Sequence, residues 1–165
     1  MLCPVCRHDN FEGEDYCENC GADLAGGDTP DSAMEFEGLL LGKHLEALVG
    51  AATFVDPGTS VHAALERMHH EGLDCLLVVS DGRLVGIFTE RDGVLKVAGR
   101  RAETLDIRDV MTADPVVLRK DDTLAVAINK MAVGGFRHIP VMDGDMPVGV
   151  VAARDVFRHF LEVLG

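Results

Sequence analysis

Four of the five cysteines in this 165-residue chain lie within its first 20 residues, as two CxxC pairs. Cys3 and Cys6 form the first pair, and Cys17 and Cys20 form the second, with ten residues between the pairs. Each CxxC turn directs two thiolates at one ion, and two such turns complete the tetrahedral sulfur site that zinc prefers. The spacing therefore predicts one zinc ion bound by these four cysteines.

Four cysteines at this spacing have other uses besides binding zinc. Two disulfides are disfavoured because the chain opens without a secretory signal, and thiols in the cytosol stay reduced. Iron in the same four-sulfur cage is an alternative that the sequence leaves open. His8 lies close to Cys6, but four cysteines already complete the site, so we expect a surface histidine. Four sulfur ligands leave no position for water or substrate, which argues against catalysis at the metal.

Residues 1–24 are too few to bury a hydrophobic core, so we expect metal binding to supply most of this segment's folding free energy. The segment resembles the short zinc-ribbon modules. It departs from them at Arg7, which follows the first CxxC turn where glycine is usual; Gly21 follows the second. Residues 25–37 are rich in Gly, Asp, Ser and Pro and lack periodicity, which predicts a flexible linker.

The rest of the chain contains an internal repeat. The stretch "VGIFTERD" at residues 85–92 returns as "VGVVAARD" at residues 148–155. From residue 60 onward the two halves align without a gap at a constant offset of 63 residues. The pattern predicts one repeat at 38–102 and a second at 103–165.

Each repeat has the same predicted order of elements. A short strand leads to a helix with apolar residues at helical spacing, then to a hairpin that turns at an Asp-Gly pair, then to a second helix. Ser60 and Thr123 stand where these first helices need an N-cap. One β-α-β-β-α unit exposes an apolar sheet face that its own helices do not cover. We therefore expect an α+β fold whose two repeats pack with pseudo-twofold symmetry, preceded by the zinc ribbon.

This pattern resembles the cystathionine beta-synthase-type (CBS) domain pair, also called a Bateman module, over about residues 38–165. The residues that carry the resemblance are "GIFTERD" and "GVVAARD", both readable against the family's Gly-x-x-Thr/Ser-x-x-Asp element, together with "VMTADPVVL" and "FRHIPV". The resemblance implies tandem CBS repeats with a cleft on each side of their interface. It also implies an adenosyl ligand there: AMP, ADP, ATP or S-adenosylmethionine.

Thr89 and Asp92 are the predicted centre of the first nucleotide site. The strand is expected to end near Phe88 and the helix to begin near Thr89, which places these two side chains on one face of the first turn. Asp92 can accept both hydroxyls of a ribose, and the helix N-terminus favours an anion. Gly86 leaves room for backbone or ligand. The alternative is a capping box, in which Thr89 and Asp92 only terminate the helix.

The family's geometry supplies the rest of the first site. Carried over residue by residue, it implies that Val116, His138 and Ile139 lie beside the base or the α-phosphate. Arg154 is then expected to face the phosphates. The alternative for His138 is a structural role, as a histidine at the sheet edge whose hydrogen bonds are satisfied.

The second site is expected to mirror the first and to be weaker. Asp155 is retained, but Ala152 replaces the hydroxyl residue, and Asp74 stands where the first site has Arg137. A lost hydroxyl bond costs about 0.5–1.5 kcal/mol, and Asp74 adds a like charge near any phosphate. The two clefts are therefore predicted to be unequal.

The composition restricts the classes of partner. With 15 Lys+Arg against 28 Asp+Glu, the formal net charge is -13, which repels nucleic acid and anionic membrane surfaces. The longest apolar stretches are far shorter than the roughly 20 residues that span a bilayer. We expect a soluble, cytoplasmic protein that binds neither nucleic acid nor membrane.

The leading functional prediction is a regulatory binding module rather than an enzyme. The sequence has no nucleophile elbow, no phosphate-binding GxxxxGK loop and no HExxH pair, and Cys75 lies in an apolar strand as a small packed side chain. Because CBS proteins commonly associate through their helices, the resemblance implies a homodimer, with an unidentified regulated protein as a further partner. The alternative is a structural or interaction protein whose clefts are unoccupied.

Overall fold

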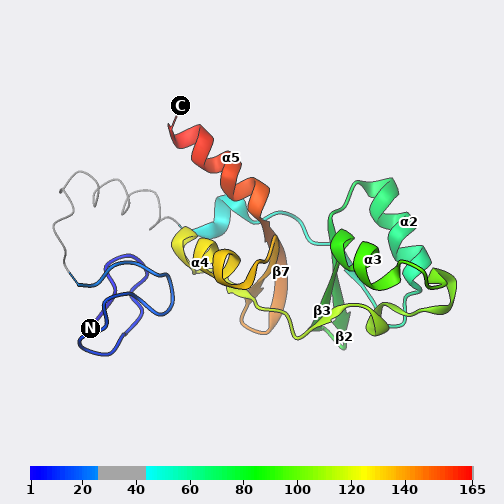
Figure 1. Ribbon diagram of the computed structural model, residues 1–165, viewed down its shortest axis with the longest axis horizontal. Helices are drawn as coiled ribbons and strands as arrows, with labels where there is room; N and C mark the ends of the chain where they lie inside the picture. Colours follow the sequence, from blue (N-terminus) through cyan, green and yellow to red (C-terminus); the bar gives the residue numbers. More distant parts are fainter. Residues whose placement is uncertain (26–43, 165) are drawn as a thin grey trace. The chain divides into compact units, whose positions relative to one another are not determined.

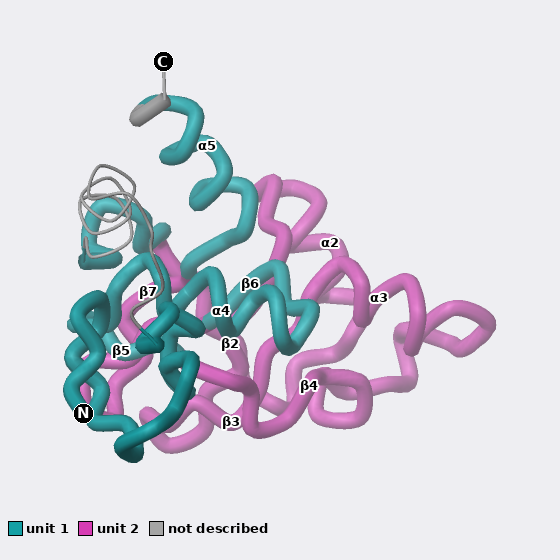
Figure 2. Tube along the Cα trace, turned by 60° about the vertical axis from the view of Figure 1, so that its left-hand side comes forward, with its two compact units in different colours: residues 1–50, 118–139, 151–165 teal, residues 51–117, 140–150 magenta. Residues whose placement is uncertain are grey.

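The computed structural model of the chain describes residues 1–25 and 44–164. Apart from Ala25, the predicted linker at 25–37 and the start of the first repeat lie outside the described residues. The described chain falls into two compact units, which Figure 2 colours separately. Unit 1 contains the described parts of 1–50, 118–139 and 151–165, and unit 2 contains 51–117 and 140–150.

A four-stranded sheet forms the centre of unit 2. Its strands are β1 (Phe54–Val55), β2 (Cys75–Ser80), β3 (Arg83–Thr89) and β4 (Thr112–Ala113), in the order β1-β2-β3-β4. β1 and β2 are parallel because a helix connects them, and the other neighbours are antiparallel. Asp81 and Gly82 both adopt positive φ, 50° and 77°, as the predicted Asp-Gly hairpin turn requires.

Helices α2 (Val61–Glu71) and α3 (Glu90–Val97) cover one face of this sheet (Figure 1). Leu76 and Val78 of β2 belong to the core beneath the helices, whereas Leu77 belongs to a second apolar cluster. This division follows from the alternation of side chains along a strand. The helices contribute the following buried residues to the core: Val61, Ala64, Met68 and Val97.

The second repeat has the same element order as the first. It comprises β5 (Leu118–Arg119), α4 (Leu124–Gly134), β6 (His138–Asp143), β7 (Met146–Ala152) and α5 (Ala153–Leu164), with β5, β6 and β7 adjacent in that order in one sheet. Three short 3-10 helices complete the described elements: η1 (Leu45–Leu48), η2 (Ala102–Thr104) and η3 (Ile107–Asp109). The predicted α+β class and the β-α-β-β-α repeat are confirmed.

The first helices of the two repeats are capped differently. The Ser60 hydroxyl oxygen accepts from the Ala63 N–H at 3.2 Å, as predicted. Thr123 occupies the N-cap position of α4, as predicted, but its side chain makes no capping bond. Its buried hydroxyl has no partner among the described residues. Both helices end at a glycine with left-handed backbone, Gly72 and Gly135.

Across residues 1–25 and 44–164, no helix is long and apolar enough to cross a bilayer.

Candidate functional site

The four predicted metal ligands converge. The Sγ atoms of Cys3 and Cys20 are 3.5 Å apart, those of Cys6 and Cys17 are 3.6 Å apart, and all four lie within 4.8 Å of one another. A tetrahedral site with Zn–S bonds of about 2.3 Å places its sulfurs about 3.8 Å apart, so this cluster fits a zinc ion. The separations far exceed the roughly 2.05 Å of a disulfide bond, and the cysteines are free.

The two CxxC turns are structural copies of each other. The Arg7 N–H donates to the Cys3 carbonyl at 2.9 Å, and the Gly21 N–H donates to the Cys17 carbonyl at 2.8 Å. Arg7 has φ 57° and Gly21 has φ 73°. Arg7 therefore adopts the left-handed conformation that a glycine usually supplies after such a turn, and the departure in sequence does not change the turn.

Hydrogen bonds within the second CxxC turn favour the thiolate form of Cys17. Burial opposes ionisation of Cys17, but backbone hydrogen bonds from Cys20 and Asn19 outweigh it and lower the pKa of Cys17 to about 6. Burial raises the pKa values of Cys6 and Cys20. Since metal ligands bind as thiolates, Cys17 is more readily prepared for a metal than Cys6 or Cys20. His8 is exposed and lies outside the sulfur cluster.

Thr89 and Asp92 form a capping box, the alternative that the sequence allows for this pair. Both the N–H and the hydroxyl of Thr89 donate to Oδ2 of Asp92, at 2.9 and 2.7 Å. In return, the Asp92 N–H donates to the Thr89 hydroxyl oxygen at 3.3 Å. Asp92 is 8% exposed. The box holds a nearly buried carboxylate in one orientation at the N-terminus of α3.

The other carboxylate oxygen of Asp92 binds two further donors. Its Oδ1 lies 2.7 Å from Lys96 Nζ and accepts from the Thr112 hydroxyl at 3.3 Å. Both carboxylate oxygens are thus engaged by protein groups, and a diol that binds Asp92 must replace donors at Oδ1. Neither partner was predicted from the sequence. Lys96 lies at i+4 from Asp92, a spacing that signals an ion pair, whereas no local pattern points to Thr112 on β4.

The second repeat holds its equivalent carboxylate more loosely. Ala152 ends β7 and offers no hydroxyl, and Asp155 lies in the first turn of α5. Oδ1 of Asp155 instead pairs with Arg158 at 3.3 Å and Arg154 at 3.8 Å. The Asp155 side chain is 27% exposed, against 10% for Asp92. Long arginine side chains therefore take the place of a rigid cap.

The remaining predicted nucleotide residues occupy different surroundings. Val116 lies between β4 and β5 and is 42% exposed. His138 and Ile139 begin β6, where Ile139 is fully buried; β6 lies between β5 and β7 rather than at the sheet edge. The predicted residues divide between the units as follows: Thr89, Asp92 and Val116 in unit 2, and His138, Ile139, Arg154 and Asp155 in unit 1.

A backbone hydrogen bond ties the start of each hairpin to the start of the helix that follows it. The Glu90 N–H donates to the Asp74 carbonyl at 3.1 Å in the first repeat. The equivalent bond in the second repeat joins Ala153 and Arg137 at 2.8 Å. The repeats therefore place Asp74 and Arg137 equivalently beside a helix N-terminus, although the two side chains carry opposite charge.

Gly86 and Cys75, both noted in the sequence, pack against other parts of the protein. A Cβ added to Gly86 would meet the Met111 side chain and lie 3.1 Å from the Thr112 carbonyl oxygen. The space at Gly86 therefore admits β4 rather than a ligand. Cys75 packs against the apolar cluster that contains Leu77, as expected of a small packed side chain.

Comparison with known proteins identifies the repeated part of the chain. The family model described as "CBS domain" matches residues 51–98 and 107–162. An uncharacterized 17.7 kDa protein of Acidianus ambivalens is 33% identical over 111 residues, which is 66% of this chain and 67% of that protein. A CBS domain-containing protein of Arabidopsis thaliana, CBSCBSPB3, is 36% identical over 116 residues, 68% of this chain. This chain spans only 20% of that plant relative.

Solved structures show the same fold. CBSX2 in complex with AMP is 25% identical with a TM-score of 0.62, covering 74% of this chain and 98% of that one. The CBS domain pair of protein MJ0100, in complex with 5'-methylthioadenosine and S-adenosyl-L-methionine, has a TM-score of 0.67 over 73% of this chain and 98% of its own. At 22% identity the latter shows the fold alone. With two matched segments that together cover more than half of its length, the chain belongs to the CBS-domain family, as a CBS pair preceded by a four-cysteine cluster that fits a zinc ribbon.

Proposed function

We propose that this chain is a regulatory module that binds an adenosyl ligand through Thr89 and Asp92. The observation that carries the proposal is the nearly buried carboxylate of Asp92, held at the N-terminus of α3 by its capping box. A carboxylate accepts both hydroxyls of a ribose, and a helix N-terminus favours a phosphate. The AMP complex of the similar CBSX2 protein supports an adenine nucleotide.

Residues of both repeats complete the proposed site. Val116, His138 and Ile139 contact the base or the α-phosphate, as the family's arrangement implies. Arg154 supplies a forked donor to the phosphates, which a guanidinium does in bidentate fashion. Asp155 takes the part of Asp92 in a second, weaker site.

Binding at the first site is an exchange of hydrogen bonds. The bonds from Thr89 to Oδ2 keep the carboxylate in place while the ribose hydroxyls take over Oδ1. Lys96, whose side chain is 40% exposed, is the donor that moves away most easily because its long stem is flexible. Ligand affinity is therefore the difference between the ribose contacts and the Lys96 ion pair that they replace.

The ligand is sensed and not consumed in this proposal. The four-cysteine site holds one zinc ion, or iron in the same cage, as a structural centre that closes the ribbon. We place the protein in the cytoplasm, where such thiols stay reduced. The regulated partner is a protein that contacts the ribbon, and the net charge of -13 disfavours nucleic acid.

A homodimer is the proposed assembly. Phe157 and Leu161 lie one turn apart on α5 and are 64% and 56% exposed. Two large apolar side chains on one helix face offer a surface that a second copy would bury.

Native mass spectrometry of freshly purified protein tests these assignments together. The expected result is a dimer with one zinc ion per chain and a bound or exchangeable adenine nucleotide. Calorimetric titration of nucleotide-free protein with AMP, ATP and S-adenosylmethionine then identifies the ligand. Conversion of ATP to products by pure protein would contradict a sensor.

A structural protein is the second candidate function, and the capping box favours it. Thr89, Lys96 and Thr112 already satisfy Asp92, so the motif serves the fold even without a ligand. The two functions predict different thermal shifts, because a ligand that binds only the folded state raises Tm. No rise in Tm with any of the adenosyl compounds at millimolar concentration would favour the structural protein.

A further inference from the structure

The second CxxC turn touches the second repeat. Asn129, on α4, donates from Nδ2 to the carbonyl oxygen of Asn19 at 3.1 Å. Its side-chain oxygen lies 3.1 Å from the position that a Cβ on Gly21 would occupy. Asn19 and Gly21 both belong to the turn around Cys17 and Cys20. The ribbon and α4 are parts of the same compact unit, coloured alike in Figure 2.

The repeat provides an internal comparison for this contact, because α2 is the counterpart of α4. On α2, His62 and Ala63 are exposed, whereas their counterparts on α4, Ala125 and Val126, are 5% and 0% exposed. These two positions therefore face solvent on α2 and are buried on α4, which also packs against α5.

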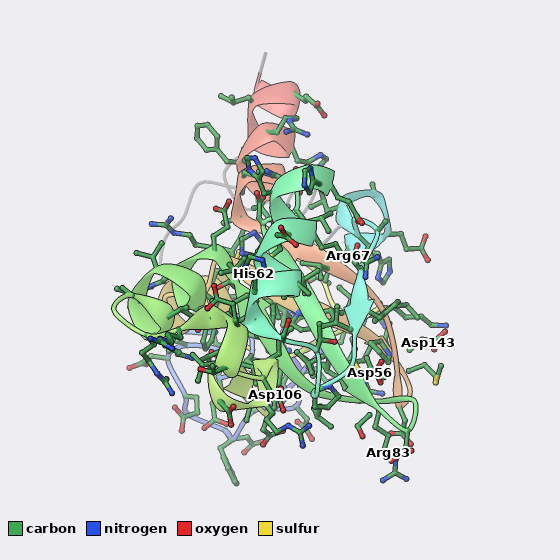
Figure 3. The ribbon with its side chains drawn as sticks, turned by 90° about the vertical axis from the view of Figure 1, so that its right-hand side faces the viewer. Asp56, His62, Arg67, Arg83, Asp106 and Asp143 are labelled. Carbon is green, nitrogen blue, oxygen red and sulfur yellow. The ribbon has the colours of Figure 1, made fainter. Side chains whose placement is uncertain are left out.

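The exposed face of α2 carries ion pairs. His62 pairs with Glu66 at 3.5 Å, and Arg67 pairs with Glu71 at 2.9 Å. Figure 3 shows His62 and Arg67 projecting from α2. The position of Glu66 on α2 is that of Asn129 on α4. A carboxylate accepts hydrogen bonds only, whereas an amide also donates, so only α4 can bind a carbonyl there.

The turn that Asn129 binds owes its shape to the sulfur site. The Asn19 side chain donates to Sγ of Cys6 at 3.6 Å, and Gly21 closes the turn with its N–H on the Cys17 carbonyl. Residues 1–24 bury almost no apolar side chain besides the cysteines, so their fold depends on the metal. The Asn19 carbonyl is thus presented to α4 only while the four sulfurs are held together.

We infer that α4 of the second repeat is the docking surface for the second CxxC turn of the ribbon, and that docking depends on the metal. Metal at the four cysteines then stabilises α4, and by linkage an intact α4 face increases the metal affinity of the ribbon. The inference rests on the proposed metal site and extends it, because it connects that site to one particular CBS repeat.

The full chain with Asn129→Glu tests this, since the variant places the residue of α2 on α4. We expect zinc affinity, measured by competition with a chromophoric chelator, to fall about two- to tenfold from loss of one hydrogen bond. The added negative charge beside thiolates acts in the same direction. Glu66→Asn, the matched change on α2, should leave zinc affinity unchanged.

Amide hydrogen exchange supplies a readout on α4 itself. In the unmodified protein, chelation should raise exchange of α4 while α2 keeps its protection and the repeats still unfold cooperatively. In Asn129→Glu, α4 should exchange faster even with zinc bound, so that chelation adds little. Asn129→Asp, nearly isosteric and without the N–H donor, carries the test if Asn129→Glu fails to fold.

The outcomes separate the two proposals. Unmodified protein that binds no metal would refute the metal site. Protein that binds zinc, with equal zinc affinity and equal α4 exchange in the asparagine variants, would overturn the docking while leaving the metal site standing.

Discussion

The two CBS repeats share a backbone and differ in their chemistry. Both tie the hairpin to the second helix by the same hydrogen bond, from Glu90 to Asp74 and from Ala153 to Arg137. Yet Asp92 is held by a capping box at 10% side-chain exposure, whereas Asp155 pairs with arginines at 27%. Conversely, it is the second repeat whose α4 touches the ribbon. The duplicated fold leaves each half free to specialise, because side chains can change while backbone contacts persist.

The largest expected effect is on nucleotide affinity, and it tests whether the principal nucleotide site lies in the first repeat. Asp92→Ala should weaken adenine-nucleotide binding about a hundredfold or more, because two hydrogen bonds to a charged group are lost. Asp155→Ala should have a far smaller effect. Calorimetry on both variants measures the difference, and Asp92→Asn, which keeps the side-chain shape, separates loss of charge from loss of the cap. Equal losses in the two alanine variants would remove the case for unequal sites.

Reversing the charge at Asp74 should make the nucleotide affinity of the second site more like that of the first. Asp74→Arg replaces a like charge near the phosphates with a forked donor, so we expect ATP binding at the second site to improve about tenfold. AMP should gain less, because a Coulomb interaction scales with ligand charge, and added salt should shrink the gain.

Titration of the Asp74→Arg protein with AMP and ATP at two ionic strengths makes the measurement. A second site that stays empty, or that improves equally for both nucleotides, would mean that Asp74 points elsewhere.

Restoring the missing hydroxyl should also narrow the difference. Ala152→Thr gives α5 the cap residue of α3, and a cap contributes about 1 kcal/mol to the free energy of unfolding. We expect a higher denaturation midpoint and modestly tighter binding at Asp155. Denaturant unfolding with unchanged m-value checks the first effect. Ala152→Val, similar in size and without a hydroxyl, is the control, and an equal gain in that variant would exclude capping as the cause.

The smallest expected effect concerns the ion pair that the ribose must displace. Lys96→Met removes one of the two donors to Asp92 Oδ1, and an i,i+4 ion pair on a helix contributes about 0.3–0.5 kcal/mol. Nucleotide binding should therefore tighten about twofold. Lys130→Met, on α4 of the second repeat, is the matched control and should leave the affinity at Asp92 unchanged. Weaker binding in Lys96→Met would show that Lys96 contacts the ligand instead.

Local sequence patterns predicted those features that are formed by residues close together in the chain. The CxxC spacing predicted the sulfur cluster, because each turn is closed by bonds between residues four apart. The Asp81-Gly82 turn and the Ser60 cap were predicted for the same reason. Thr123 also stands at the predicted N-cap position, but its side chain makes no capping bond. Its hydroxyl is buried by packing at 8% exposure, which no local pattern encodes.

By itself the sequence determined the duplicated β-α-β-β-α order, the four-sulfur cluster and the pairing of Thr89 with Asp92, all of which depend on periodicity and short spacings. Only the tertiary structure decided that Thr112 binds Asp92 from twenty residues away and that β4 fills the space at Gly86. It alone brought Asn129 to Asn19, across 110 residues. Such contacts depend on how packed elements meet, and chain folding brings together residues whose separation in sequence carries no signal of it.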